Sequence, residues 1–170
     1  MGPEVVTAYA AERWTEFGVA TAGAAAALAG LLVVAVSINL ERILQYPSLP
    51  NRAGHTLILF ALPLVVALLL VVPGQPDAAL GSELLVIGVV IGAFMLVTNA
   101  RTPLTEQESR TTWVLSRLLP AVLSCGFLAL TGITLIAEAG GGLYWLVPAV
   151  LAAIVFGLIN AWVLLIEILR

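Results

Sequence analysis

The chain has very few charged residues. Only 10% of its 170 residues are Asp, Glu, Lys or Arg, whereas 61% are hydrophobic. A soluble domain carries about 25% charged residues, because its surface must face water. Here charge is too scarce to cover a globule, so most of the surface must face lipid. The composition excludes an ordinary soluble protein and predicts one transmembrane domain over residues 1–170.

Lysine is absent, and cysteine and histidine occur once each, as Cys125 and His55. One cysteine cannot form an intrachain disulfide, and the chain lacks the ligands of a zinc site. No serine has a nearby histidine that could act as its base, and no basic stripe could bind nucleic acid. We therefore expect no enzyme, no cofactor and no nucleic-acid partner.

Arginine in place of lysine, with abundant Ala, Val, Leu and Gly, is typical of GC-rich bacterial genomes. This composition predicts a multi-pass protein of the bacterial plasma (inner) membrane. Its expected partners are the lipid bilayer and either a second copy or another membrane protein.

Five apolar runs are present. Crossing about 30 Å of hydrocarbon takes about 20 helical residues, which four of the runs provide. The second run is the shortest, and a helix that begins near Arg52 would lengthen it. The fold class expected from them is an all-α, polytopic transmembrane helix bundle with spans at about 17–40, 53–72, 78–99, 113–137 and 143–169. Turn signals separate the runs. Pro73–Pro76 reads as a tight turn before a capping Asp77, and Gly140–Gly142 follows the fourth run. A capping box, Thr105 to Glu108, predicts that the fourth helix begins before Trp113.

Arginine placement predicts the orientation. With five spans and the N-terminus outside, the inner segments contain Arg42, Arg52, Arg101, Arg110, Arg117 and Arg170. The outer segments contain only Arg13, so the C-terminus should lie inside. Residues 1–16 form an amphipathic interfacial segment that could lie on the outer membrane surface or extend the first span.

Two runs carry small residues spaced by three and four positions, which places them on one helix face. They are Gly23, Ala27 and Gly30 in the first run, and Ala153 and Gly157 in the last. Small residues let helices approach closely, and such packing joins helices in lipid. These candidate helix-packing faces predict contact within one chain or between copies. The alternative is that they line a pore or a partner-binding seam.

Uncharged polar residues gather near the predicted inner interface. This candidate polar layer consists of Ser37, Asn39, Thr98, Asn99 and Asn160. An amide at this depth must find hydrogen-bond partners. The layer is interpreted either as structural hydrogen bonding between helices or as the lining of a vestibule, and Asn99 could also cap the third helix.

No ionisable residue lies in the middle of a span, which argues against a proton-coupled pump. His55 lies beside Arg52, where the predicted inner loop meets the second span, and we expect it to be solvated. Charged residues at the inner end form a candidate cytoplasmic rim, the expected docking surface. They are Glu41, Arg42, Glu106, Glu108, Arg110 and Glu167.

The run Gly23 to Leu44, GAAAALAGLLVVAVSINLERIL, is followed by YPSLPNRAGHTLIL and VVPGQ. Over this first half, the chain resembles small integral membrane proteins of high-GC bacteria. Some of these are catalogued as modulators of an ATP-dependent membrane protease of the FtsH type. The resemblance implies a regulatory role, and its motifs are packing and turn residues.

Two functions remain after these exclusions. The first is a regulatory or accessory subunit of a membrane complex, acting through helix–helix association. The second is a homo-oligomeric channel or passive transporter with the uncharged polar layer as its lining.

Overall fold

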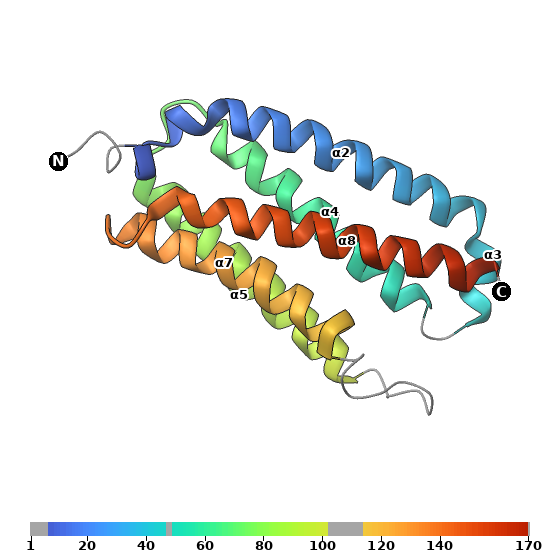
Figure 1. The fold of residues 1–170 in the computed structure, drawn as a ribbon. Helices are drawn as coiled ribbons and strands as arrows, with labels where there is room; N and C mark the ends of the chain where they lie inside the picture. The colour runs from blue at the N-terminus through green and yellow to red at the C-terminus, as the bar shows by residue number, and fades with distance from the viewer. Residues whose placement is uncertain (1–6, 47–48, 102–113, 170) are drawn as a thin grey trace.

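The protein is a bundle of long antiparallel helices (Figure 1). The computed structural model describes residues 7–46, 49–101 and 114–169. Its long helices are α2 (Thr15–Ile38), α4 (Leu49–Leu70), α5 (Asp77–Arg101), α7 (Leu119–Ile136) and α8 (Leu146–Leu169). The shorter elements are η1 (Ala11–Trp14), α3 (Leu40–Gln45), a π-helical turn η2 (Val114–Leu118) and η3 (Gly142–Trp145).

Five segments are long and apolar enough to cross a membrane. This confirms the expected all-α chain with five apolar spans, and it makes the chain a multi-pass membrane protein by helix length and composition. The predicted capping box, Thr105 to Glu108, and Trp113 lie outside the described residues. Where the description resumes, the fourth span begins with the turn η2 and continues as α7.

Helix ends follow local sequence signals. Asn39 ends α2, and its side-chain amide donates to the carbonyl oxygen of Ala35 at 2.9 Å. Pro50 lies in the first turn of α4, where a missing N–H costs little. Beyond α7, Gly140, Gly141 and Gly142 have φ angles of 85°, 113° and 53°. These left-handed conformations favour glycine. α7 itself ends at Ile136, and Glu138 already has a φ angle of 48°, so the helix ends before the triple glycine, which forms the turn into η3.

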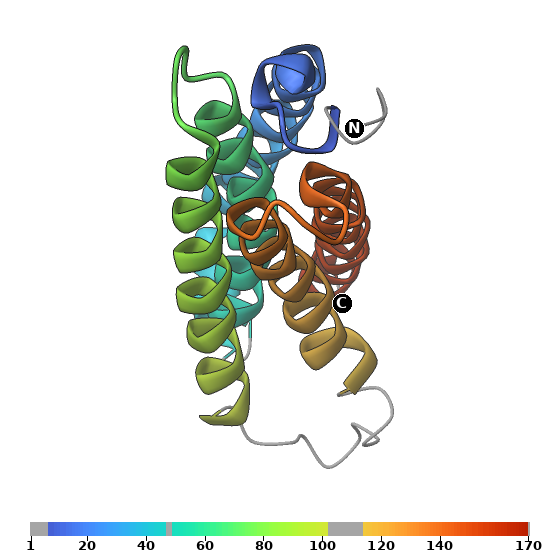
Figure 2. The same cartoon turned by 90° about the vertical axis from the view of Figure 1, so that its left-hand side faces the viewer.

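Two ends of the bundle can be distinguished. The N-terminal end contains η1, η3 and the turn before α5, and the arginine-rich end contains α3 with Arg42, Arg52, Arg101 and Arg117. Figure 2 views the bundle from the N-terminal end. Between the ends, α4 packs against α2 and α8, α8 packs against α7, and α7 packs against α5.

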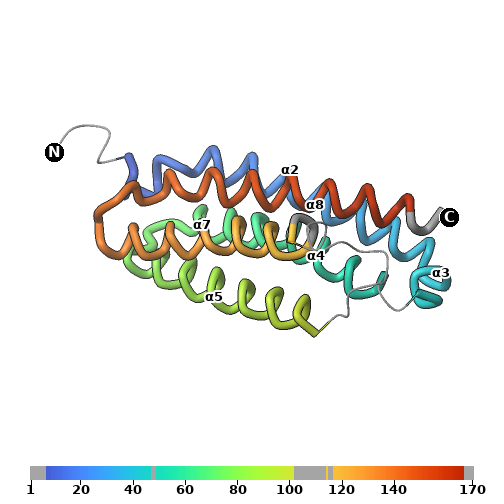
Figure 3. Tube along the Cα trace, turned by 60° about the horizontal axis from the view of Figure 1, so that its bottom comes forward, coloured from blue at the N-terminus to red at the C-terminus, as the bar shows by residue number. Residues whose placement is uncertain are grey.

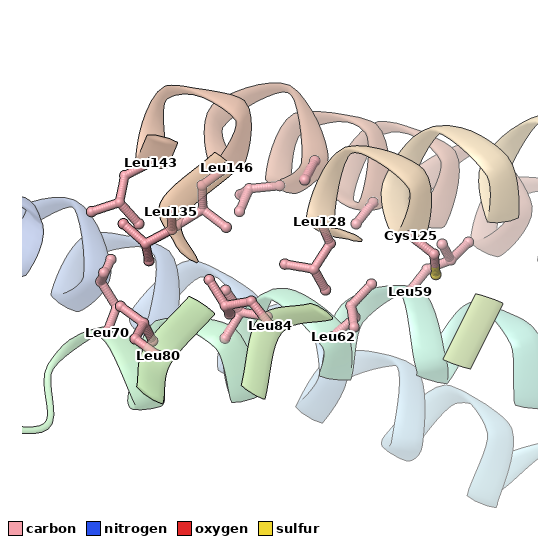
Figure 4. Close-up of a cluster of buried hydrophobic side chains, with 14 of the residues drawn as sticks. Leu59, Leu62, Leu70, Leu80, Leu84, Cys125, Leu128, Leu135, Leu143 and Leu146 are labelled. Atoms are coloured by element: carbon pink, nitrogen blue, oxygen red, sulfur yellow. The ribbon is translucent and has the colours of Figure 1, made fainter. Parts of the chain in front are cut away.

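Leucine fills the space between the helices. The main core cluster contains Leu59, Leu62, Leu84, Leu128 and Leu146, all of them buried (Figure 4). These residues come from α4, α5, α7 and α8, so one apolar core joins the four helices. α2 contributes little to this cluster and lies at the edge of the bundle.

The closest packing joins α5 and α7, which run side by side in Figures 1 and 3. A Cβ added at Gly88 would lie 2.8 Å from the amide nitrogen of Ala129, and one added at Gly92 would lie 3.1 Å from the Cβ of Cys125. Gly81 and Gly132 face each other in the same seam. Gly88 and Gly92 form a G-x-x-x-G pair, the spacing typical of close helix contact in membranes.

The N-terminal segment folds across its end of the bundle. The backbone N–H of Gly141 donates to the hydroxyl oxygen of Tyr9 at 3.1 Å, and the Trp14 indole donates to the Thr7 carbonyl at 2.8 Å. Trp14 also packs edge-to-face against Tyr144, with ring centroids 5.2 Å apart. Residues 7–14 therefore contact the loop between α7 and α8, an attachment that the amphipathic pattern did not predict.

Candidate functional site

The candidate polar layer is divided among several helices. Ser37 and Asn39 lie at the end of α2, Thr98 and Asn99 lie at the end of α5, and Asn160 lies in α8. Ser37 is exposed, and Asn39 donates within its own helix. Asn99 is only 2% exposed, and Asn160 is 6% exposed. Within the described residues, no hydrogen bond joins the three asparagines into one network.

Asn99 connects two helices. Its side-chain amide donates to the carbonyl oxygen of Arg117 at 2.9 Å. Arg117 belongs to the π-helical turn η2, just before Pro120. Proline has no backbone N–H, so the regular helical hydrogen bonding is interrupted near this turn. Asn99 thus holds the start of the fourth span against α5, and the expected helix-capping role gives way to this contact.

His55 does not lie in a loop, so the predicted solvated position is wrong. α4 begins at Leu49, which places His55 in its second turn with only 8% of its surface exposed. Its Nε2 lies 2.7 Å from the Thr98 hydroxyl oxygen. The same hydroxyl lies 2.8 Å from the Phe94 carbonyl, so it can donate to that carbonyl and accept from the His55 tautomer that has its proton on Nε2.

The charge around this pair is positive. The Arg117 guanidinium lies close enough to His55 to interact with its charge. Arg52 precedes His55 by one turn of α4, and Arg101 follows Thr98 by one turn of α5. No Asp or Glu occurs in residues 49–60, 90–101 or 114–120. The described helix segments around the pair therefore contain arginines and no carboxylate.

The polar layer does not line a pore through the described part of the chain. The cavity between α4, α7 and α8 has a volume of about 10 Å³, about one water molecule, and is lined mainly by apolar residues such as Leu62 and Leu128. Leucine fills the rest of this space.

The two predicted small-residue faces are used differently. Ala153 and Gly157 of α8 are buried, and a Cβ on Gly157 would overlap the ring of Phe60 in α4. Gly23, Ala27 and Gly30 of α2 are exposed, and a Cβ on either glycine would meet no atom within 4 Å. The α8 face packs inside the chain, whereas the α2 face points away from it.

α2 packs through its opposite side. Gly18, Thr21, Ala25 and Leu32 are buried and follow helical spacing. A helix rotates about 100° per residue, so Gly23 and Ala25 point about 200° apart. The exposed stripe, defined here as Gly23, Ala27, Gly30, Val34 and Ser37, therefore faces directly away from α4.

Only part of the predicted cytoplasmic rim can be placed. Glu41 and Arg42 lie on α3 and are exposed. Glu106, Glu108 and Arg110 fall outside the described residues, as does the side chain of Glu167. The rim stays a prediction.

The sequence contained signals for two structural features that the predictions did not use. One is the G-x-x-x-G pair at Gly88 and Gly92, which marks the α5–α7 seam. The other is the proline at position 50, which is compatible with a helix that starts early enough to include His55. Comparisons with protein-family models, curated proteins and solved structures find no match to this chain.

Proposed function

We propose that this protein is a regulatory or accessory subunit of a membrane complex and that the exposed stripe of α2 is its contact surface. The observation that carries the proposal is the open space around Gly23 and Gly30. The glycines of the α5–α7 seam show how small residues pack in this chain, since neighbouring backbone fills the space beside Gly88 and Gly132. The α2 glycines have the same small size and no neighbour.

The physical reason is specific to membranes. Lipid tails are as apolar as leucine, so helices associate mainly through close packing of small residues and interhelical hydrogen bonds. The stripe offers both, because Ser37 adds a hydroxyl at its arginine-rich end. A partner helix lying along the stripe could approach the α2 backbone closely over several turns.

The partner is a second membrane protein or a second copy of the chain. The resemblance of the first half of the sequence makes a membrane-protease complex of the FtsH type the first partner to test. The predicted rim, of which Glu41 and Arg42 are described and exposed, would then lie beside the partner's inner segments.

The experiment replaces the stripe residues with leucine and follows complex formation. Gly23→Leu, Ala27→Leu and Gly30→Leu are combined in one variant. The matched controls are Ala24→Leu, an exposed alanine about 100° from Gly23, and Gly126→Leu, an exposed glycine of α7 with open space around it. Complexes are crosslinked in native membranes and their masses are measured after purification.

We expect the amount of crosslinked complex to fall at least about tenfold in the stripe variant, because each bulky side chain keeps the partner helix from approaching the α2 backbone. Both controls should retain it. Complexes and masses that survive the triple substitution would refute the proposal. A closed ring of copies that conducts ions and survives the same change would favour the channel instead.

A further inference from the structure

An apolar groove of about 290 Å³ runs between α4 and α5. Its eight lining residues are Ile58, Ala61, Leu62 and Val65 of α4 and Val86, Ile87, Val90 and Ile91 of α5. These helices follow each other in the chain, yet they pack mainly against other helices. The groove is where they separate, and it opens on the outside of the bundle.

Helical spacing extends both walls of the groove to the arginine-rich end. On α4, the groove residues Ile58, Leu62 and Val65 share a face with His55, because the steps are three, four and three residues. On α5, Ile87 and Ile91 share a face with Thr98 and Arg101. The His55–Thr98 hydrogen bond therefore bridges the two walls beyond this end of the groove, and Arg101 lies one turn further on with an exposed side chain.

The length of the groove fits within one leaflet. From Ile58 to Val65 the helix rises about 10 Å, at 1.5 Å per residue. One leaflet contributes about 15 Å, half of the roughly 30 Å of hydrocarbon in a bilayer. The apolar part is therefore short enough to lie along an acyl chain within one leaflet.

Charge and size select the occupant. Arg101 at the mouth is exposed, and the described helix segments beside it contain no carboxylate, which suits a phosphate. A single acyl chain is much narrower than a helix, which is about 10 Å wide, and suits an apolar groove of about 290 Å³.

We propose that the α4–α5 groove binds one acyl chain of an anionic phospholipid from the leaflet at the arginine-rich end, with the lipid phosphate at Arg101. The His55–Thr98 pair lies beside the part of the lipid that joins the headgroup to the acyl chain. It fixes the spacing of the two helices at that level. The site is on a different surface from the exposed stripe of α2, so it stands independently of the proposed function.

The test uses the full chain in nanodiscs that contain equal amounts of phosphatidylglycerol and phosphatidylcholine. After transfer to mild detergent, native mass spectrometry counts the retained lipids of each kind. Arg101→Gln is compared with Arg42→Gln, which removes the same charge from α3, away from the groove. Ala61→Phe fills the groove, and Ala24→Phe adds the same ring to an exposed site on α2.

We expect the wild type to retain phosphatidylglycerol preferentially and Arg101→Gln to lower that preference roughly fivefold, the effect of one arginine near a membrane surface. Arg42→Gln should stay within about twofold of wild type. Ala61→Phe should reduce retained phosphatidylglycerol, whereas Ala24→Phe should not. Ala61→Leu, a smaller change, should give a partial loss and keeps the test valid if the larger ring disturbs folding.

Two results would overturn the proposal. Equal effects of the two arginine substitutions would show a general attraction of the arginine-rich end for anionic lipid. Unchanged lipid retention in both Ala61 variants would place the lipid outside the groove.

Discussion

Thr98 of α5 lies 2.7 Å from the His55 imidazole of α4, and this hydrogen bond joins two consecutive helices that pack little against each other elsewhere. The two helices are also held by their connecting turn at the opposite end. Between these points they separate around the apolar groove. Their relative position at the arginine-rich end therefore depends on a polar contact more than on side-chain packing.

The first prediction concerns the strength of this bond. Thr98→Val keeps the shape of the side chain and leaves the His55 N–H without its acceptor. A double-mutant cycle with His55→Ala should give a coupling free energy of about 0.5–2 kcal/mol, the range found for hydrogen bonds between membrane helices. Unfolding is followed by circular dichroism as dodecyl sulfate is added to mixed micelles.

Thr131→Val is the matched control, because the buried Thr131 hydroxyl donates only to the Phe127 carbonyl one turn earlier. It should show no coupling to His55→Ala. A coupling near zero for Thr98 itself would mean that the contact does not stabilise the bundle.

The second prediction tests the α5–α7 seam. Gly88→Ala places a Cβ 2.8 Å from the Ala129 amide nitrogen, so the helices must move apart. We expect the free energy of unfolding to fall by about 1–3 kcal/mol, as for other overpacked sites. Gly126→Ala should be neutral or stabilising, because its Cβ meets open space and alanine favours helix. Equal stability of the two variants would contradict the close packing.

The third prediction concerns the N-terminal segment. Tyr9→Phe removes the hydroxyl that accepts the Gly141 N–H. The loss of one hydrogen bond, about 1 kcal/mol, should raise amide exchange around Gly141 roughly fivefold. Hydrogen–deuterium exchange of a peptide covering residues 139–146 measures this. Tyr144→Phe keeps the ring beside Trp14 and should leave the rate unchanged, and an unaltered rate in Tyr9→Phe would disprove the attachment.

The fourth prediction is the orientation. In a Cys125→Ala background, single cysteines replace the exposed residues Ala78, at the N-terminal end, and Gln45, at the arginine-rich end. Because arginine is retained on the inner side, a membrane-impermeant thiol reagent should label Ala78→Cys in intact cells. Gln45→Cys should react only after the membrane is opened. The reverse labelling pattern would invert the predicted topology.

Much of the fold is a direct consequence of the sequence. Apolar runs of about 20 residues must form helices in lipid, because unpaired backbone groups are too costly there. Proline and glycine between the runs then form the turns that separate the helices, as Gly140–Gly142 do between α7 and α8. The number of spans and their limits to within a few residues follow from these local rules.

The assignment of helix faces required the tertiary structure. Small residues on α2 and on α8 give the same pattern in sequence, yet Gly157 is buried against Phe60 and Gly30 is exposed. In a soluble protein, hydrophobicity would separate inside from outside. In a membrane both sides of a helix are apolar, so only the packing of the other helices decides which face is covered.

The His55–Thr98 hydrogen bond is another contact that the tertiary structure decides and the local sequence does not. The two residues are 43 positions apart, and nothing in the local sequence of either one specifies the other. The sequence determined that the chain is a five-span membrane protein, because backbone hydrogen bonding and hydrophobicity act locally. The tertiary structure alone decided that α5 packs on α7, that the α2 stripe is left open, and that His55 meets Thr98, because these contacts depend on how whole helices fit together.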